Sequence, residues 1–417
     1  MKMCRILPLI FVFTILSTAL AACSRQGSDS LSTEGLEGTY NITMWVSEKD
    51  GIAAQFKEQI DAFEADNPGI IINAQIEGVA EGESASKVIA DVSTAPDIYC
   101  FAQDQLARLV QAAALASPPS AVAESIKRDN DEDSVEAASV AGRVYAYPMT
   151  SDNGYYMYYD TSIISEEDAE SLEKIIAACE KNKVKFRYAL ENAWYTASFF
   201  FATGCHSTWS LGADGTFDAV DDTFNSDKGL IAMKGMQKLV QSSCYDSNAD
   251  IFTNAGVVIS GTWTAADAAA HFGDNLGITD LPSFEVDGKT YHLGSFKGNK
   301  LMGVKPQSDS KRTAVLSLLA QYLTGEECQK QRFESFEWGP SNKELQKSDA
   351  VRDNPSLAAL AKQSEYAQLQ GQIHGAWWDI ARILGADAKA ARSEADLRVA
   401  LSEYEAAIKN VVAGSKK

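Results

Sequence analysis

The sequence predicts an α/β fold divided into two domains, and three observations support this. Residues 40–46 alternate apolar and polar side chains, which is typical of a half-buried strand, and residues 51–65 carry apolar side chains at helical spacing. Residues 70–76 are strand-like again, so the three segments form a βαβ unit whose strands lie parallel in one sheet. At 417 residues, the chain is too long for a single hydrophobic core.

Strands and helices continue to alternate along the rest of the chain, as an α/β fold requires. Further strands are expected at residues 97–101, 144–149, 155–159, 184–189, 257–259, 277–281 and 294–304. Further helices are expected at residues 103–114, 166–180, 228–240, 265–272, 312–323 and 387–412, the last as one long amphipathic helix. Residues 150–154 are polar and lie between two aromatic strands, so we interpret them as a crossing between domains.

One tryptophan stands where an α/β sheet binds its ligands. The β-branched run 257–259 is short and apolar, as a strand buried on both faces should be, and Trp263 follows its carboxyl end. Thr264 is expected to cap the next helix. Because ligands bind outside the carboxyl ends of strands in open α/β sheets, Trp263 is a candidate ligand contact. A core-packing role for this tryptophan stays open from this stretch alone.

The amino terminus has the features of an export signal. Two basic residues precede the apolar segment 6–20, which is too short for a stable membrane span, and the run Leu20–Cys23 resembles the lipobox of bacterial lipoproteins. We expect residues 1–22 to be a signal peptide, Cys23 to be lipidated and residues 23–37, rich in serine, to be a flexible tether. A signal peptide without lipidation is the alternative. The predicted location is extracytoplasmic, anchored to the cell membrane through lipid only.

Composition and charge restrict the classes of partner. Apolar residues make up 45% of the chain and charged residues 23%, as in ordinary soluble proteins. The net charge of −20 argues against nucleic acid, which is bound by basic surfaces, and disfavours strongly anionic ligands.

The cysteines indicate neither a disulfide framework nor a zinc site. Beyond Cys4 and Cys23, five remain, and no two of them form a CxxC pair. They are Cys100, Cys179, Cys205, Cys244 and Cys328. We expect free, buried thiols, with a single Cys205–Cys244 disulfide as the alternative.

No sequence motif indicates catalysis. The four histidines are scattered, and the chain lacks a metalloprotease motif, a nucleophile elbow, a Walker A loop and a dinucleotide-binding glycine motif. The acidic run 127–136 fails as an EF-hand, because Ser134 replaces the turn glycine and Val140 the bidentate glutamate. We therefore expect no enzyme, cofactor or metal, although a glycosidase pair among 57 acidic residues stays open.

Six segments, in order, resemble the extracellular solute-binding proteins of ABC importers, in the family of maltose-binding protein. These segments are ITMWVSEKDG with QFKEQIDAFEADNPG, APDIYCFAQDQLARL, GRVYAYPMTSDNGYYMYYDTSI, VVISGTWTAADA with GITDLPSF, WGPSNKEL and AWWDIAR. The resemblance covers Tyr40 to Asn410. It implies a two-lobe periplasmic-binding-protein-like fold of type II with the ligand cleft between the lobes. By similarity, residues 38–151 and 295–345 form the first lobe, and residues 152–294 and 346–417 the second.

The resemblance also implies a set of sugar-binding residues. They are Glu48, Lys49, Asp50, Phe101, Asp104, Asp152, Trp194, Tyr195, Trp263, Trp378 and Arg382. Three places depart from the family: the Asp-Lys order near residue 49 is not kept, Phe101 replaces a tryptophan and Asp152 replaces a glutamate. These residue types suit a sugar, because aromatic rings pack on its C–H faces while carboxylates and arginine bind its hydroxyl groups.

The implied function is capture of an oligosaccharide, with a maltodextrin as the first expectation, and its delivery to an ABC permease. We expect a monomer. The alternatives are a secreted glycan hydrolase, a glycan-binding surface protein without a transport role, or the same fold with a sugar phosphate, polyamine or metal as its ligand.

Overall fold

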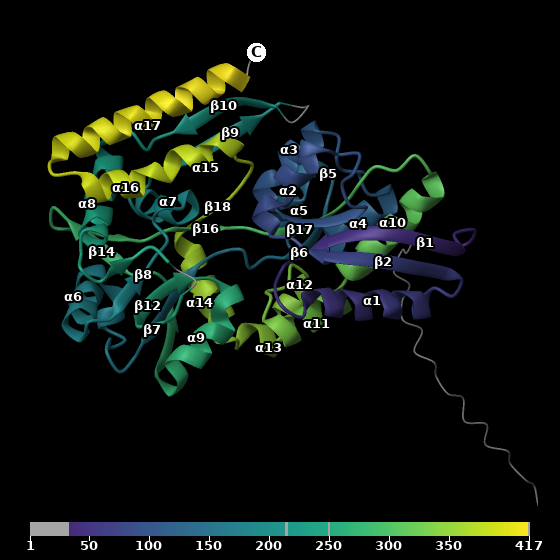
Figure 1. Cartoon of the computed structure of the whole chain (residues 1–417), viewed down its shortest axis with the longest axis horizontal. Coiled ribbons are helices and arrows are strands. Elements are labelled where there is room, and N and C mark those ends of the chain that lie inside the picture. Colours follow the sequence, from purple (N-terminus) through teal and green to yellow (C-terminus); the bar gives the residue numbers. More distant parts are fainter. Residues whose placement is uncertain (1–32, 213–215, 249–250, 416–417) are drawn as a thin grey trace, which may run out of the picture.

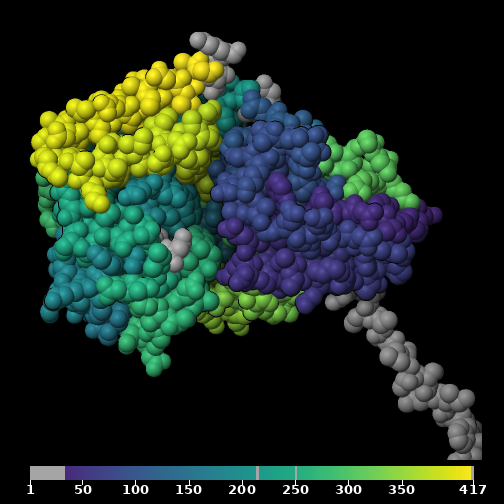
Figure 2. Space-filling view, viewed as in Figure 1, coloured from purple at the N-terminus to yellow at the C-terminus, as the bar shows by residue number. Residues whose placement is uncertain are grey.

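The structure, a computed structural model, describes residues 33–212, 216–248 and 251–415 and consists of two α/β lobes (Figure 1). The predicted signal peptide, Cys23 and most of the predicted tether lie outside the described residues. Within the described part of the chain, no helix is long and apolar enough to cross a membrane. Figure 2 shows that the two lobes lie side by side and meet along a continuous boundary.

The first lobe is built on a five-stranded sheet with the order β2-β1-β3-β17-β6. Its strands are β1 (Gly38–Val46), β2 (Ile70–Gly78), β3 (Ile98–Ala102), β6 (Tyr147–Thr150) and β17 (Lys300–Val304). β1 pairs in parallel with β2 and β3, whereas β17 is antiparallel to β3 and β6. The predicted βαβ unit is confirmed, because α1 (Ile52–Asp66) connects β1 to β2.

Helices cover both faces of this sheet. Ile98 and Cys100 of β3 share a core with the apolar faces of α1 and α10 (Ser310–Leu323). The alternate residues, Tyr99 and Phe101, face a second core on the other side of the sheet. The remaining elements of this lobe are α2 (Glu81–Ala90), η1 (Gln103–Gln105), α3 (Leu106–Gln111), α4 (Ser120–Asp129), α5 (Glu132–Ala137), β4 (Ser139–Val140), β5 (Arg143–Val144) and α11 (Glu326–Phe336).

The second lobe contains another five-stranded sheet, with the order β11-β8-β12-β7-β13. Its strands are β7 (Tyr156–Asp160), β8 (Lys185–Arg187), β11 (Tyr245–Asp246), β12 (Ala255–Ser260) and β13 (Leu276–Thr279). β8 is parallel to β11 and β12, and β7 is antiparallel to β12 and β13. β12 is buried on both faces as predicted, since Val257 and Ile259 pack in one core and Val258 in another.

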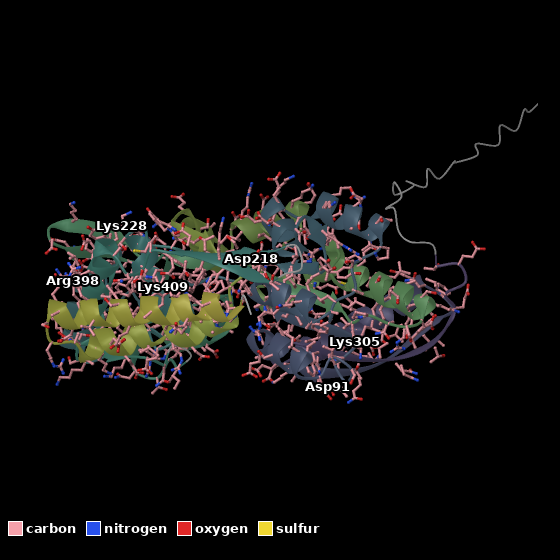
Figure 3. All side chains as sticks on the ribbon, turned by 90° about the horizontal axis from the view of Figure 1, so that it is seen from above. Asp91, Asp218, Lys228, Lys305, Arg398 and Lys409 are labelled. Atoms are coloured by element: carbon pink, nitrogen blue, oxygen red, sulfur yellow. The ribbon has the colours of Figure 1, made fainter. Side chains whose placement is uncertain are left out.

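The rest of the second lobe surrounds this sheet. Its helical elements are η2 (Asp168–Glu170), α6 (Leu172–Asn182), α7 (Ala193–Ala202), α8 (Asp227–Val240), η3 (Thr262–Thr264), α9 (Ala265–Phe272), η4 (Gly273–Asn275), α14 (Pro355–Gln363), η5 (Ser364–Tyr366), α15 (Gly375–Ala381), α16 (Ile383–Ala390) and α17 (Glu394–Ser415). Two hairpins are β9 (Ser207–Leu211) with β10 (Phe217–Asp222) and β14 (Ser283–Val286) with β15 (Lys289–His292). Charged side chains such as Asp91, Arg398 and Lys409 project outward (Figure 3).

Three segments connect the lobes. The first runs from β6 to β7, and the second from β16 (Ser295–Lys297), which pairs with β18 (Ala367–Leu369), to β17. The third leads from α11 through α12 (Lys343–Gln346) and α13 (Asp349–Arg352) to α14. Gly154 lies in the first segment and is tightly packed, because a Cβ atom there would come within 2.6 Å of Leu360 Cδ1 and 3.2 Å of the backbone oxygen of Phe296 in β16.

Several local predictions are wrong. The predicted strands 144–149 and 294–304 are each two strands of different sheets, β5 with β6 and β16 with β17. Thr264 does not cap α9 with its side chain, because its hydroxyl donates instead to the carbonyl of Gly261 at 3.2 Å. The predicted helix 387–412 is two helices, α16 and α17. Ser393 and Asp396 explain the break: Asp396 Oδ2 accepts from the backbone N–H of Ser393 at 2.9 Å, and Ser393 Oγ accepts from the backbone N–H of Asp396. This reciprocal arrangement is a capping box, which starts a new helix.

Candidate ligand-binding cleft

A cavity of about 710 Å³ lies between the two lobes. Residues of the first lobe that line it are Ser47, Glu48, Lys49, Ala80, Glu81, Gly82, Ala102, Asp104, Gln105, Lys300 and Trp338. Residues of the second lobe and the connecting segments that line it are Asn153, Asn192, Trp194, Tyr195, Trp263, Gln370 and Trp378. Because both lobes contribute, a molecule bound here would contact both of them.

Strand ends explain why these residues meet. The parallel strands β1, β2 and β3 end together, and they are followed by Ser47–Lys49, Ala80–Gly82 and Asp104. In the second lobe, Trp263 follows the carboxyl end of β12. The two sheets thus present the carboxyl ends of their parallel strands to the same cavity, which is the edge where open α/β sheets bind ligands.

Aromatic side chains form the second-lobe wall of the cleft. The ring centroids of Trp194 and Trp263 are 5.8 Å apart, and Tyr195 lies 5.0 Å from Trp194. Tyr155 fixes this wall from behind, because its hydroxyl donates to the carbonyl of Trp194 at 2.9 Å. Trp263 and Trp378 are half-buried, so part of each ring remains available to a ligand.

Asp104 is a buried carboxyl group of the cleft, with 7% of its surface exposed. Gln370 Nε2 donates to its Oδ1 at 2.9 Å, and the side chain of Trp378 also hydrogen-bonds to it. Burial raises the pKa of Asp104 to about 7, because the charged form loses hydration that these partners replace only in part. Asp104 therefore titrates near neutral pH and connects the first lobe to Trp378.

Two lysines bring positive charge to the cleft. Lys49 Nζ reaches across it and donates to the backbone oxygen of Trp263 at 3.4 Å. Lys300 Nζ lies 4.4 Å from the centre of the Trp338 ring and 4.0 Å from a carboxylate oxygen of Glu81. Burial, and then the charge of Lys300, lower the pKa of Lys49. Cationic and anionic side chains therefore face the aromatic wall.

Seven of the residues predicted from the resemblance line this cleft, and four do not. Phe101 is fully buried in the core against Tyr99, because it points to the face of β3 opposite its neighbours in the chain. Asp50 is exposed beyond the rim of the cavity. Arg382 is exposed as well and pairs with Asp379 at 3.4 Å.

Asp152 is the fourth residue outside the cleft. Only 2% of its surface is exposed. Its Oδ2 accepts from Thr262 Oγ1 at 2.9 Å and from the backbone N–H of Gly339 at 2.8 Å. Asp152 therefore joins two connecting segments to the second lobe, and it borders a separate cavity behind them.

The sequence prediction omitted several residues that line the cleft. Glu81 follows β2 directly, so the strand-end rule applied to the second strand would have found it. Trp338 also lines the cleft; it is 2% exposed, and its indole N–H has no hydrogen-bond partner among the described residues. Lys300 and Gln370 carry no local signal, because distant segments bring them to the cleft.

Two α/β lobes around a cleft lined from both sides define a two-lobe ligand-binding protein. The chain belongs to the bacterial extracellular solute-binding protein family, whose model matches residues 58–359. It is a solute-binding protein and not an enzyme, as its relatives and structural neighbours are binding proteins. Among the described residues, no group of three His, Cys, Asp or Glu side chains could hold a metal ion.

Named relatives and solved structures agree with this assignment. The galactooligosaccharide-binding protein of Bacillus subtilis (strain 168) is 23% identical over 388 residues, which cover 88% of each chain. The maltotriose-binding protein of Pyrococcus abyssi (strain GE5 / Orsay) is 20% identical and covers 80% of this chain and 73% of its own.

Solved structures share the fold over almost the whole chain. A structure described as being with acarbose has a TM-score of 0.79 and 26% identity, covering 90% of this chain and all of its own. The maltodextrin-binding protein MalE1 from L. casei BL23, without ligand, has a TM-score of 0.75 and 19% identity, covering 91% of this chain and all of its own. The predicted two-lobe periplasmic-binding-protein-like fold is confirmed.

Proposed function

We propose that this protein captures an oligosaccharide in the interlobe cleft and delivers it to the membrane subunits of an ABC importer. The observation that carries the proposal is the arrangement of the cleft, in which an aromatic wall faces charged side chains. The named relatives, which bind galacto-oligosaccharides and maltotriose, support the ligand class. A malto-oligosaccharide is our first candidate, since solved neighbours include a maltodextrin-binding protein.

The proposed contacts divide by chemistry. The aromatic residues Trp194, Tyr195, Trp263 and Trp378 would pack against the C–H faces of the sugar rings. The charged residues Glu48, Lys49 and Asp104, with Glu81 and Lys300 beside them, would bind hydroxyl groups. Because the two sets lie largely on opposite lobes, a ligand that contacts both binds the closed arrangement best and shifts the population toward it.

Calorimetry with a panel of malto- and galacto-oligosaccharides tests the proposal. We expect saturable binding of one series, no release of shorter products, a smaller radius of gyration in solution scattering and a higher melting temperature with ligand. Absence of binding to both series would overturn the oligosaccharide assignment. Hydrolysis of the glycan would overturn the transport role, and saturable binding at an unchanged radius would contradict lobe closure.

The titration of Asp104 predicts a pH dependence of affinity. A sugar hydroxyl that donates to Asp104 favours its charged form, so binding lowers a pKa that is about 7 in the free protein and releases a proton. Affinity for the sugar is therefore expected to rise with pH, by at most about tenfold per pH unit, up to about pH 7. Above that pH it should level off. Calorimetry in two buffers of different ionisation enthalpy measures the released proton. Asp104→Asn should abolish that release; an unchanged release in this variant would contradict the assignment.

We also propose that Cys23 carries a lipid that anchors the protein outside the cytoplasm. The run Leu20–Cys23 and the membership of an extracellular solute-binding family support this. Cys23→Ala is expected to move the protein from the membrane fraction to the soluble fraction without changing its melting temperature, since the change lies in the predicted tether. Retention of Cys23→Ala on membranes after a high-salt wash would show that another feature anchors the chain.

A further inference from the structure

Two of the five cysteines in the described part of the chain are neighbours in the second lobe. All five are free and buried. Cys179 lies in the last turn of α6, and Cys244 immediately precedes β11. The two side chains interact, since each thiol shifts the pKa of the other, and both pack in the same core. Cys244 Sγ is also 3.9 Å from the backbone oxygen of Ile176, one helical turn before Cys179.

The backbone holds this pair in place. The carbonyl of Cys179 accepts from the N–H of Val184 at 3.0 Å, and the carbonyl of Cys244 accepts from the N–H of Phe186 at 2.9 Å. Both cysteines are thus fixed to the beginning of β8. Gly256 on the neighbouring strand permits the close packing, because a Cβ atom there would lie 2.5 Å from Val184 Cγ2 and 3.5 Å from Cys179 Sγ.

The remaining cysteines have other neighbours. Cys100 Sγ lies 3.4 Å from Met149 Sδ, and Cys205 Sγ lies 3.5 Å from Thr203 Oγ1. The alternative disulfide between Cys205 and Cys244 is therefore not favoured by the structure, which places Cys179 beside Cys244 instead. Sequence could not distinguish these pairings, because they depend on how α6 packs beside β8.

The surroundings also shift the pKa values of the two thiols in opposite directions. Contact with the Cys179 thiol, and then with the Ser242 hydroxyl, lowers the pKa of Cys244, and the contact between the two thiols raises the pKa of Cys179. The thiolate is the nucleophile in disulfide exchange, so Cys244 is the sulfur that reacts first.

We propose that Cys179 and Cys244 form a disulfide when the chain meets a disulfide oxidant outside the cytoplasm. The Cys244 thiolate attacks the oxidant's disulfide, forms a mixed disulfide and releases one oxidant thiolate. Cys179 then loses its proton to solvent, attacks Cys244 Sγ and releases the second thiolate. The protein loses two hydrogens, and the oxidant is reduced to two thiols.

Compartment and burial set when this reaction takes place. Members of an extracellular family leave the reducing cytoplasm, where disulfides rarely persist. The exposed fraction is 0% for Cys179 and 3% for Cys244, so oxidation occurs while the second lobe folds or opens locally. Once formed, the bond is shielded from reductants and joins α6 to the segment before β11.

Peptide mapping of the full chain tests the proposal. The protein is unfolded and then refolded in an equimolar mixture of reduced and oxidised glutathione. It is next denatured in the presence of an alkylating agent, which caps every free thiol, and digested without reduction. We expect a linked peptide pair containing Cys179 and Cys244, lighter by two hydrogens, in the majority of chains, with Cys100, Cys205 and Cys328 alkylated. Alkylation of both Cys179 and Cys244 in the wild type, or a Cys205–Cys244 link, would overturn the proposal.

Two matched variants separate this pair from the other buried thiols. Cys205→Ser should keep the link, whereas Cys179→Ser should lose it and leave Cys244 alkylated. Unfolding the oxidised wild type in a reductant and refolding it there should lower its melting temperature, whereas the same treatment should leave the melting temperature of Cys179→Ser unchanged. Should Cys179→Ser fail to fold, Cys244→Ser provides the same comparison, and the wild-type peptide map remains decisive alone.

Discussion

Replacing Trp263 or Trp378 by alanine is expected to weaken oligosaccharide binding by about 1–3 kcal/mol, or roughly 5- to 150-fold. Both rings are half-buried in the cleft, so a bound sugar would cover the part that is now exposed. Each truncation removes a rigid apolar surface from which the ligand displaces water on binding. Truncation of such desolvated aromatic side chains causes the largest losses of binding free energy at interfaces. Calorimetry with the best ligand of the oligosaccharide panel measures the effect.

Trp377 provides the matched control. It precedes Trp378 in α15, but it is fully buried, and its indole N–H donates to the hydroxyl of Tyr404 at 2.9 Å. Trp377→Ala should lower the melting temperature of the ligand-free protein strongly, whereas Trp263→Ala and Trp378→Ala should change it little. A large loss of stability with unchanged affinity in Trp263→Ala would mean that this residue is a core-packing tryptophan.

Local periodicity predicted most elements but not how the sheets are assembled. The helix 265–272 agrees with α9 residue for residue, because its alanine-rich sequence has a high helix propensity between the strand end and Gly273. The position of β17 between β3 and β6 depends on pairing between residues about two hundred positions apart. No short window contains that information. The break before α17, by contrast, could have been predicted from the sequence, because the Ser393–Asp396 spacing is that of a capping box.

The same distinction applies to the cleft. Residues directly after a strand end, such as Lys49, Asp104 and Trp263, were predicted and line the cavity. Phe101 shows that sequence alone did not place a strand residue on the correct face. Successive residues of a strand point to opposite faces, so Ala102 lines the cleft and Phe101 enters the core. Lys300 comes from an antiparallel strand and could be placed only once the sheet order was known.

Asp152→Ala is expected to destabilise the folded protein by about 3 kcal/mol. The change leaves the hydroxyl of Thr262 and the N–H of Gly339 without their acceptor in a site where only 2% of Asp152 is exposed. Hydrogen bonds to a carboxylate contribute more than neutral ones, and unpaired buried donors cost additional free energy. Denaturant unfolding, followed as the free energy of unfolding, measures the loss.

Thr262→Val is the matched control for Asp152→Ala, because it removes one of the two donors and keeps the carboxylate bonded to Gly339. We expect it to cost about 1 kcal/mol, clearly less than Asp152→Ala. The family resemblance instead implies that Asp152 binds the sugar directly. In that case, Asp152→Ala would reduce the affinity of the folded protein for the oligosaccharide and leave the free energy of unfolding nearly unchanged. Asp152 does not line the cleft, and its Oδ2 accepts from Thr262 of the second lobe and from Gly339 of the third connecting segment. We therefore expect the opposite result: a large loss of stability and a small change in affinity.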